Sequence, residues 1–86
     1  MRHRTTPRFW ERYARLPRDV RQLADKNFEL LKGNPRHPSL QFKKLGDLWS
    51  ARVGLAHRAL AIGDGEDFIW VWIGTHDDYE RITRGR

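Results

Sequence analysis

The segment that decides the fold is residues 68–74, Phe-Ile-Trp-Val-Trp-Ile-Gly, which leads directly into residues 75–79, Thr-His-Asp-Asp-Tyr. β-Branched and aromatic side chains on both alternating faces predict a strand that is covered on two sides, as in the middle of a small sheet. Gly74 ends this apolar pattern, and an imidazole, two carboxylates and a phenol follow it. Small domains often place their chemistry where a buried strand ends, so we expect the functional site here.

Length and charge limit the class of protein. A chain of 86 residues, 38% of them hydrophobic, predicts a single domain, residues 1–86, with one modest core. Its 17 Lys and Arg residues against 11 Asp and Glu residues give a formal net charge of +6. Such an excess favours a polyanionic partner such as RNA, DNA or an acidic protein, although many proteins with this excess bind no nucleic acid.

Features that the sequence lacks limit the cellular location and the kinds of site further. The chain has no Cys, which excludes disulfides, thiolate metal ligands and a Cys nucleophile and fits a reducing compartment. No apolar run approaches the roughly 20 residues of a membrane span, and residues 1–6 lack the apolar region of a signal peptide. We therefore expect a cytoplasmic protein with no membrane partner.

Hydrophobic periodicity predicts two helices before the strands. Thr6-Pro7 is typical of an N-cap followed by proline at the first helical position, and apolar residues then recur at helical spacing up to Leu16. Pro17 breaks this first helix. A second apolar stripe runs over residues 20–31 and ends at Gly33. We expect a helical hairpin that covers one face of a sheet.

Four strands are expected after a loop at residues 36–39. They cover residues 41–45, 49–53, 57–62 and 68–74, and turns that contain glycine join them. The fold class is therefore α+β, with an N-terminal helical hairpin packed on a small twisted antiparallel sheet. Residues 2–5 could add an edge strand, although their sequence gives this little support.

Basic side chains are expected to meet on the sheet face that the helices leave open. Arg52 and Arg58 lie on adjacent strands, and Lys43 and Lys44 lie one strand away. Guanidinium groups bind phosphate bidentately and stabilise the charge that builds up in its transition state. Taken singly, each of these residues is more often a solvated surface charge, so only their convergence supports a site.

His76 and Tyr79 are the candidate proton carriers. Both follow the turn at Gly74, and an imidazole or a phenol can move protons to and from ribose oxygens. His76 could also be a local cap, and Tyr79 could pack its ring against Trp72 and place its hydroxyl in water. Together with Asp77 and Asp78, His76 could bind a divalent cation, but adjacent residues rarely direct three ligands at one ion. We predict no metal and no small-molecule cofactor.

Five short segments occur along the chain in an order that resembles that of a known protein family. The segments are residues 34–40 (Asn-Pro-Arg-His-Pro-Ser-Leu), 42–45 (Phe-Lys-Lys-Leu), 49–54 (Trp-Ser-Ala-Arg-Val-Gly), 57–60 (His-Arg-Ala-Leu) and 72–79 (Trp-Ile-Gly-Thr-His-Asp-Asp-Tyr). In this order they resemble the RelE/ParE superfamily of bacterial toxins, and the HigB/RelE-like members most. The resemblance implies a compact α+β toxin that cuts mRNA, commonly on the ribosome, without metal or cofactor. A cognate antitoxin is the implied protein partner.

Carried over by position, the resemblance assigns Arg52 and Arg58 to the scissile phosphate. It makes His76 the general acid or base, and Tyr79 a residue that positions or stacks on a base. The RNA backbone would be held by a basic pair, Lys43 and Lys44. In RelE-type members the ribose 2′-hydroxyl attacks the adjacent phosphate and leaves a 2′,3′-cyclic phosphate.

Two departures from the family pattern leave other functions open. Ser50 stands where RelE has a lysine, and Asp77-Asp78 place negative charge beside a site for phosphate. ParE-like relatives share the architecture but act on DNA gyrase by binding, so a gyrase-poisoning toxin is one alternative. A relative that binds RNA without cutting it is another.

Overall fold

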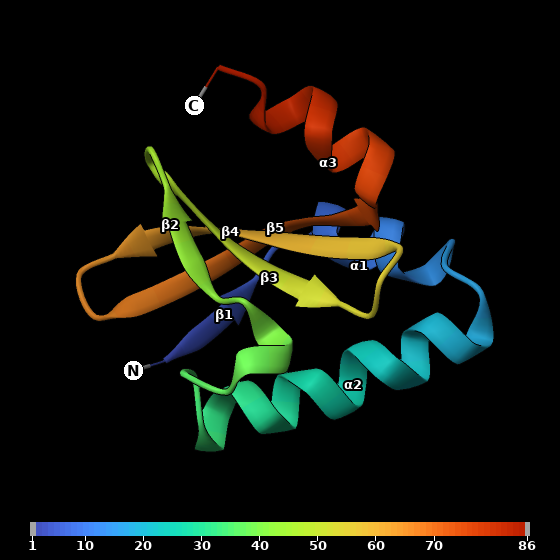
Figure 1. The fold of residues 1–86 in the computed structure, drawn as a ribbon, viewed down its shortest axis with the longest axis horizontal. Helices are drawn as coiled ribbons and strands as arrows, with labels where there is room; N and C mark the ends of the chain where they lie inside the picture. The colour runs from blue at the N-terminus through green and yellow to red at the C-terminus, as the bar shows by residue number, and fades with distance from the viewer. Residues whose placement is uncertain (1, 86) are drawn as a thin grey trace.

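The computed structural model of the protein describes residues 2–85 (Figure 1). In chain order the elements are β1 (His3–Thr5), α1 (Pro7–Ala14), α2 (Arg18–Gly33), a short 3₁₀ helix η1 (Pro38–Leu40), β2 (Lys43–Leu45), β3 (Leu48–Val53), β4 (His57–Asp64), β5 (Asp67–Thr75) and α3 (His76–Thr83). The fold class is α+β, as predicted. None of the helices within residues 2–85 has the length and apolar character needed to cross a membrane.

The sheet has five strands in the order β1-β5-β4-β3-β2. Strands β2 to β5 form the predicted antiparallel meander. The expectation of a purely antiparallel sheet is wrong at one edge, because β1 pairs with β5 in parallel. The sheet is therefore mixed, and β5 lies inside it between β1 and β4.

Strand β1 forms because tertiary contacts outweigh its weak local preference. The ring of His3 stacks on Phe68 and Trp70, with centroid distances of 5.8 and 6.1 Å. Arg4 forms an ion pair of 2.7 Å with Asp64, the last residue of β4. These partners lie 60 or more positions away along the chain, so a local sequence pattern could not reveal them.

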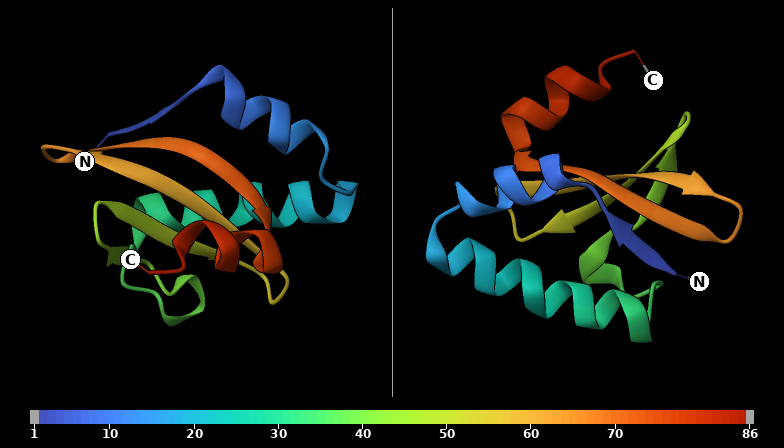
Figure 2. Two further views of the ribbon diagram at one scale, coloured as in Figure 1. Left: turned by 90° about the horizontal axis from the view of Figure 1, so that it is seen from above. Right: turned by 180° about the vertical axis from the view of Figure 1, so that it is seen from behind.

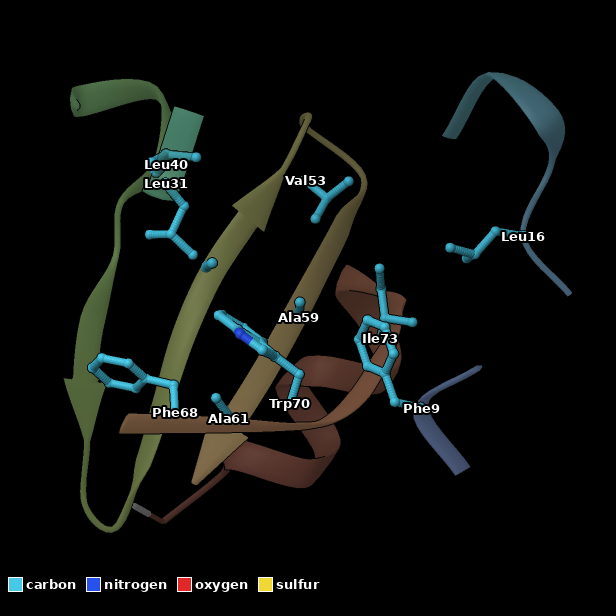
Figure 3. Close-up of a cluster of buried hydrophobic side chains, with 11 residues drawn as sticks. Phe9, Leu16, Leu31, Leu40, Val53, Ala59, Ala61, Phe68, Trp70 and Ile73 are labelled. Atoms are coloured by element: carbon cyan, nitrogen blue, oxygen red, sulfur yellow. The ribbon is translucent and has the colours of Figure 1, made fainter. Parts of the chain in front are cut away.

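Helices α1 and α2 contribute to one core on one face of the sheet (Figure 3). The threonine cap is confirmed, since the Thr6 hydroxyl accepts from the backbone N–H of Phe9 at 3.2 Å. The expected helical hairpin is matched in part, since both helices pack on one face of the sheet and an apolar pocket of about 110 Å³ lies between α1, α2 and the strands. The two helices are linked by the Tyr13 hydroxyl, which donates to Asp25 at 2.7 Å.

A second, smaller core lies on the opposite face, under a helix that the sequence did not predict. Residues 76–83 form α3, and Figures 1 and 2 show α3 and α2 on opposite sides of the sheet. The Thr75 hydroxyl caps α3 by accepting from the backbone N–H of Asp78 at 3.2 Å. This spacing of Thr and Asp is a helix start signal, so residues 75–79 begin a helix and are more than the polar end of β5. The cluster that α3 covers contains Leu48, Leu60, Trp72 and Tyr79.

A bulge in β5 supplies apolar side chains to both cores. Leu60 pairs with Trp72 while the next residue, Ala61, pairs with Trp70, so Val71 is the extra residue. Without the bulge, Trp70 and Trp72 would share a face, because side chains alternate along a strand. With it, Trp70 joins the core under α1 and α2, and Trp72 joins the core under α3.

Replacing Gly54 with alanine is expected to destabilise the protein by about 1–3 kcal/mol. Gly54 has φ +66°, and a Cβ there would lie 2.7 Å from Cδ2 of Leu23 on α2. Gly33→Ala is the matched control, because a Cβ at Gly33 meets no atom within 4 Å. Urea unfolding of both variants measures the difference. Equal stabilities of the two variants would contradict this account of the turn.

The folding stability should fall as the pH drops below about 6.5, partly through His3. The Trp70 indole N–H donates to Nδ1 of His3 at 3.0 Å, which requires this nitrogen to carry no proton. Burial lowers the pKa of His3 from its ordinary 6.5, the charge of Lys32 lowers it further, and Asp67 opposes both. As the pH falls, His3 therefore takes up its proton in the unfolded chain before it does so in the folded protein. The stability present above about pH 6.5 is lost progressively as the pH falls through the folded-state pKa of His3.

The His3→Phe variant keeps a ring at this position but cannot titrate. Urea unfolding of both proteins between about pH 7.5 and about pH 5 should show a shallower pH dependence for His3→Phe. Identical pH slopes for the two proteins would rule out His3 as a contributor.

Candidate active site

A polar hollow of about 360 Å³ lies on the α3 face of the sheet. Strands β2, β3 and β4, helix α3 and Gln41, two residues before β2, contribute to its wall. The residues that line it are Gln41, Lys43, Leu45, Ser50, Arg52, Arg58, His76, Tyr79, Glu80 and Thr83. All four predicted catalytic residues are therefore brought together, along with one of the two predicted lysines.

The two arginines face each other across β3 and β4 and share one acceptor. Arg52 Nε donates to the Gly54 carbonyl oxygen at 3.1 Å, and Arg58 Nη1 donates to the same oxygen at 3.2 Å. Arg58 also donates to the carbonyl of His57 at 2.7 Å. Within residues 2–85 neither guanidinium forms an ion pair with a carboxylate. Two adjacent like charges that form no ion pair with a carboxylate in this part of the chain favour binding of an anion, although the charge of Glu80 acts on Arg58 from the same hollow.

Burial, and then the like charge of Arg52, lower the pKa of Arg58 from its ordinary value. An arginine remains protonated in proteins, so this shift indicates an unfavourable environment for the cation rather than a neutral side chain. The unfavourable environment would improve when an anion enters the hollow.

Tyr79 is part of the core and not a free aromatic surface. Its side chain is 7% exposed and packs with Leu48, Leu60 and Trp72. The Ser50 hydroxyl, on a residue only 2% exposed, donates to the Tyr79 hydroxyl oxygen at 3.1 Å. Ser50 therefore holds the phenol in place on the floor of the hollow. This burial supports the positioning role of Tyr79 over base stacking.

His76 begins α3 and has a carboxylate partner that sequence reasoning missed. Its Nε2 lies 3.1 Å from Oε1 of Glu80, and both side chains are partly exposed. The His76 backbone N–H donates to the Ala56 carbonyl at 2.8 Å, which ties α3 to the turn between β3 and β4. A prediction of α3 would have placed Glu80 one helical turn after His76.

The two acidic residues that follow His76 do not line the hollow. Asp78 pairs with Arg81 on the same helix. The hydrogen bond from Arg81 lowers the pKa of Asp78, so this carboxylate is charged but already paired. The concern that Asp77 and Asp78 would repel a phosphate applies instead to Glu80.

Strand geometry separates the predicted lysine pair. Lys43 pairs with Ser50 and lines the hollow, whereas Lys44 pairs with Trp49 and does not. Adjacent residues of a strand point to opposite faces, so this separation could have been anticipated from the sequence. Among residues 2–85 there is no group of three or more His, Asp or Glu side chains suited to a metal ion.

Solved structures share this arrangement of elements. The YoeB/ParE toxin from Agrobacterium tumefaciens matches with a TM-score of 0.66 and 19% identity, over 88% of this chain and 99% of that chain. A chain of the RelB-RelE antitoxin-toxin complex from Methanococcus jannaschii matches with a TM-score of 0.72 and 14% identity, over 92% and 96%. The isolated E. coli RelE toxin matches with a TM-score of 0.63 and 14% identity, over 96% of each chain.

The chain has the RelE/ParE toxin fold. This confirms the fold that the motif order suggested. No protein-family model and no curated protein matches the sequence. The likeness to these toxins therefore lies in the path of the backbone. Any chemistry in the hollow depends on this chain's own side chains.

Inorganic phosphate should bind in the hollow of this RelE/ParE fold and raise the thermal stability of the protein. Phosphate at roughly ten times its Kd would stabilise the folded state by about 1.4 kcal/mol. The double variant Arg52→Gln/Arg58→Gln should lose this stabilisation, because it removes both unpaired guanidinium groups. The phosphate effect is measured as the difference in thermal unfolding temperature between phosphate and chloride at matched ionic strength.

Arg8→Gln is the control for this measurement, since Arg8 is exposed on α1 and does not line the hollow. It removes one positive charge without touching the arginine pair. If the double variant keeps the full phosphate effect, the arginine pair is not the anion site.

Proposed function

We propose that this chain is the toxin of a toxin–antitoxin pair and an endoribonuclease that cuts mRNA. The observation that supports this best is the pair of guanidinium groups, which share the Gly54 carbonyl without a carboxylate partner and lie in one hollow with His76. This combination of two fixed cations and an imidazole suits a phosphodiester. The ribosome as the place of cleavage, and the cytoplasm as the location, follow from the family resemblance.

The reaction that fits the hollow is attack of a ribose 2′-hydroxyl on the adjacent phosphorus. The bond from the 2′-oxygen to phosphorus forms, and the bond from phosphorus to the 5′-oxygen breaks, which gives a 2′,3′-cyclic phosphate and a 5′-hydroxyl. Arg52 and Arg58 neutralise the charge that builds up on the phosphate oxygens. The 2′-hydroxyl loses its proton and the leaving 5′-oxygen gains one; His76 carries out one of these transfers as the general acid or base, and solvent water carries out the other.

The remaining residues of the hollow position the reacting groups. Tyr79, fixed by Ser50, supports the Arg58 guanidinium, whose Cζ lies 5.9 Å from the centre of the Tyr79 ring. Lys43 holds the RNA backbone at the β2 side. Lys44 would contact RNA only outside the hollow.

A cognate antitoxin is the proposed protein partner. RelB-RelE antitoxin-toxin complexes are known for the similar chains from Methanococcus jannaschii, E. coli and Pyrococcus horikoshii. For this chain, a helix or extended segment of the antitoxin would cover the basic hollow and exclude RNA.

Induction of the protein in a bacterium should stop growth and produce new mRNA 5′ ends, which sequencing of 5′-hydroxyl ends maps across the transcriptome. His76→Ala should lower the cleavage rate by about 10²- to 10⁴-fold, because it removes the proton carrier. Arg58→Gln should lower the rate by about 10²- to 10³-fold. Arg8→Gln is the matched control and should cut as the wild type does.

Intact mRNA in cells that contain folded protein would overturn the endoribonuclease. Growth arrest with a DNA damage response, retained in an Arg52→Ala/His76→Ala variant, would instead identify the gyrase-poisoning alternative. RNA binding without any new 5′ ends would identify the RNA-binding relative.

A further inference from the structure

Gln41 has a backbone conformation that glutamine rarely adopts. Its φ and ψ angles are both 43°, in the left-handed region. Within residues 2–85, every other residue with a positive φ is a glycine. A side chain at such a position is strained, and strain of this kind concentrates at functional sites.

The surrounding backbone fixes this conformation. Gln41 follows the 3₁₀ helix η1, and its backbone N–H donates to the Pro38 carbonyl at 3.3 Å. The His37 imidazole caps η1 by accepting from the backbone N–H of Ser39 at 3.2 Å. Leu40, next to Gln41, is anchored in the core at 1% exposure. A glycine would end η1 with less strain, so ending the helix does not by itself account for a glutamine.

The side chain of Gln41 is available to a ligand. It is exposed, lines the polar hollow with Lys43 and Arg52, and makes no hydrogen bond through its amide to any residue within 2–85. The hollow that it lines also contains the cations of Lys43, Arg52 and Arg58, which are suited to phosphate. A neutral amide offers one acceptor and two donors, which match the edge of a base better than a phosphate.

We propose that the Gln41 amide reads the base of the nucleotide next to the phosphate that Arg52 and Arg58 hold, and that it favours adenine. This inference rests on the proposed RNA target. A glutamine amide pairs with adenine through two hydrogen bonds, one accepted from the exocyclic amine and one donated to a ring nitrogen. The fixed backbone at Gln41 places its side chain beside the hollow before RNA binds.

The test measures RNA binding without cleavage. Short single-stranded RNAs carry 2′-O-methyl groups, so that no 2′-hydroxyl can attack, and each position is varied in turn among the four bases. Fluorescence anisotropy of the full-length wild-type protein should show about tenfold tighter binding when adenine occupies one position. Gln41→Met keeps the length and the backbone strain but removes the amide. Gln41→Gly removes the side chain and relieves the strain.

Both variants should lose the adenine preference at that position, while their affinity for RNAs without adenine stays within about twofold of the wild type. A Gln41→Met variant that keeps the preference would overturn the inference, as would a wild type that binds RNA without base preference or does not bind RNA. The inference and the proposed function fail separately. Adenine-selective binding without mRNA cleavage in cells would overturn only the endoribonuclease, and cleavage with an unchanged preference in Gln41→Met would overturn only the role of Gln41.

Discussion

The carbonyl oxygen of Gly54 organises the candidate site, because both guanidinium groups donate to it. The turn that presents this oxygen has a positive φ and lies against Leu23 of α2, so the helical layer on one face sets the geometry of the cations on the other. The same turn accepts the first N–H of α3 through Ala56. One short turn thus links both layers of the fold to the two cations and to the imidazole.

The hollow attracts anions because two nearby carboxylates form ion pairs with residues other than its arginines. Lys43, Arg52 and Arg58 line it together with only one carboxylate, that of Glu80, which pairs with His76. The carboxylate of Asp78 is turned to Arg81 instead. The net charge of +6 describes the chain as a whole and does not locate such a site. The local pairing of opposite charges determines where a phosphate would be favoured.

Much of this arrangement could be predicted from the sequence, and the failures have physical causes. Alternation along β3 and β4 was enough to place Arg52 and Arg58 on one face, and the same rule separates Lys43 from Lys44. The bulge at Val71 carries no local signal, since it depends on the register between two strands. The helix start at Thr75 was visible but was interpreted as a strand end. Glu80 was missed as a consequence, because its place in the hollow depends on that helix.

The parallel pairing of β1 with β5 affects the order in which the molecule can be completed. Arg2 and Asp67, which are hydrogen-bonded at this edge, are 65 positions apart in the chain. A ribosome makes β1 before its partner strand β5, so β1 has nothing to pair with until residues 67–75 have been made. Helix α3, which carries His76, is made later still. A nascent copy would therefore have neither a closed sheet nor an assembled hollow until residues 67–83, which form β5 and α3, have been made.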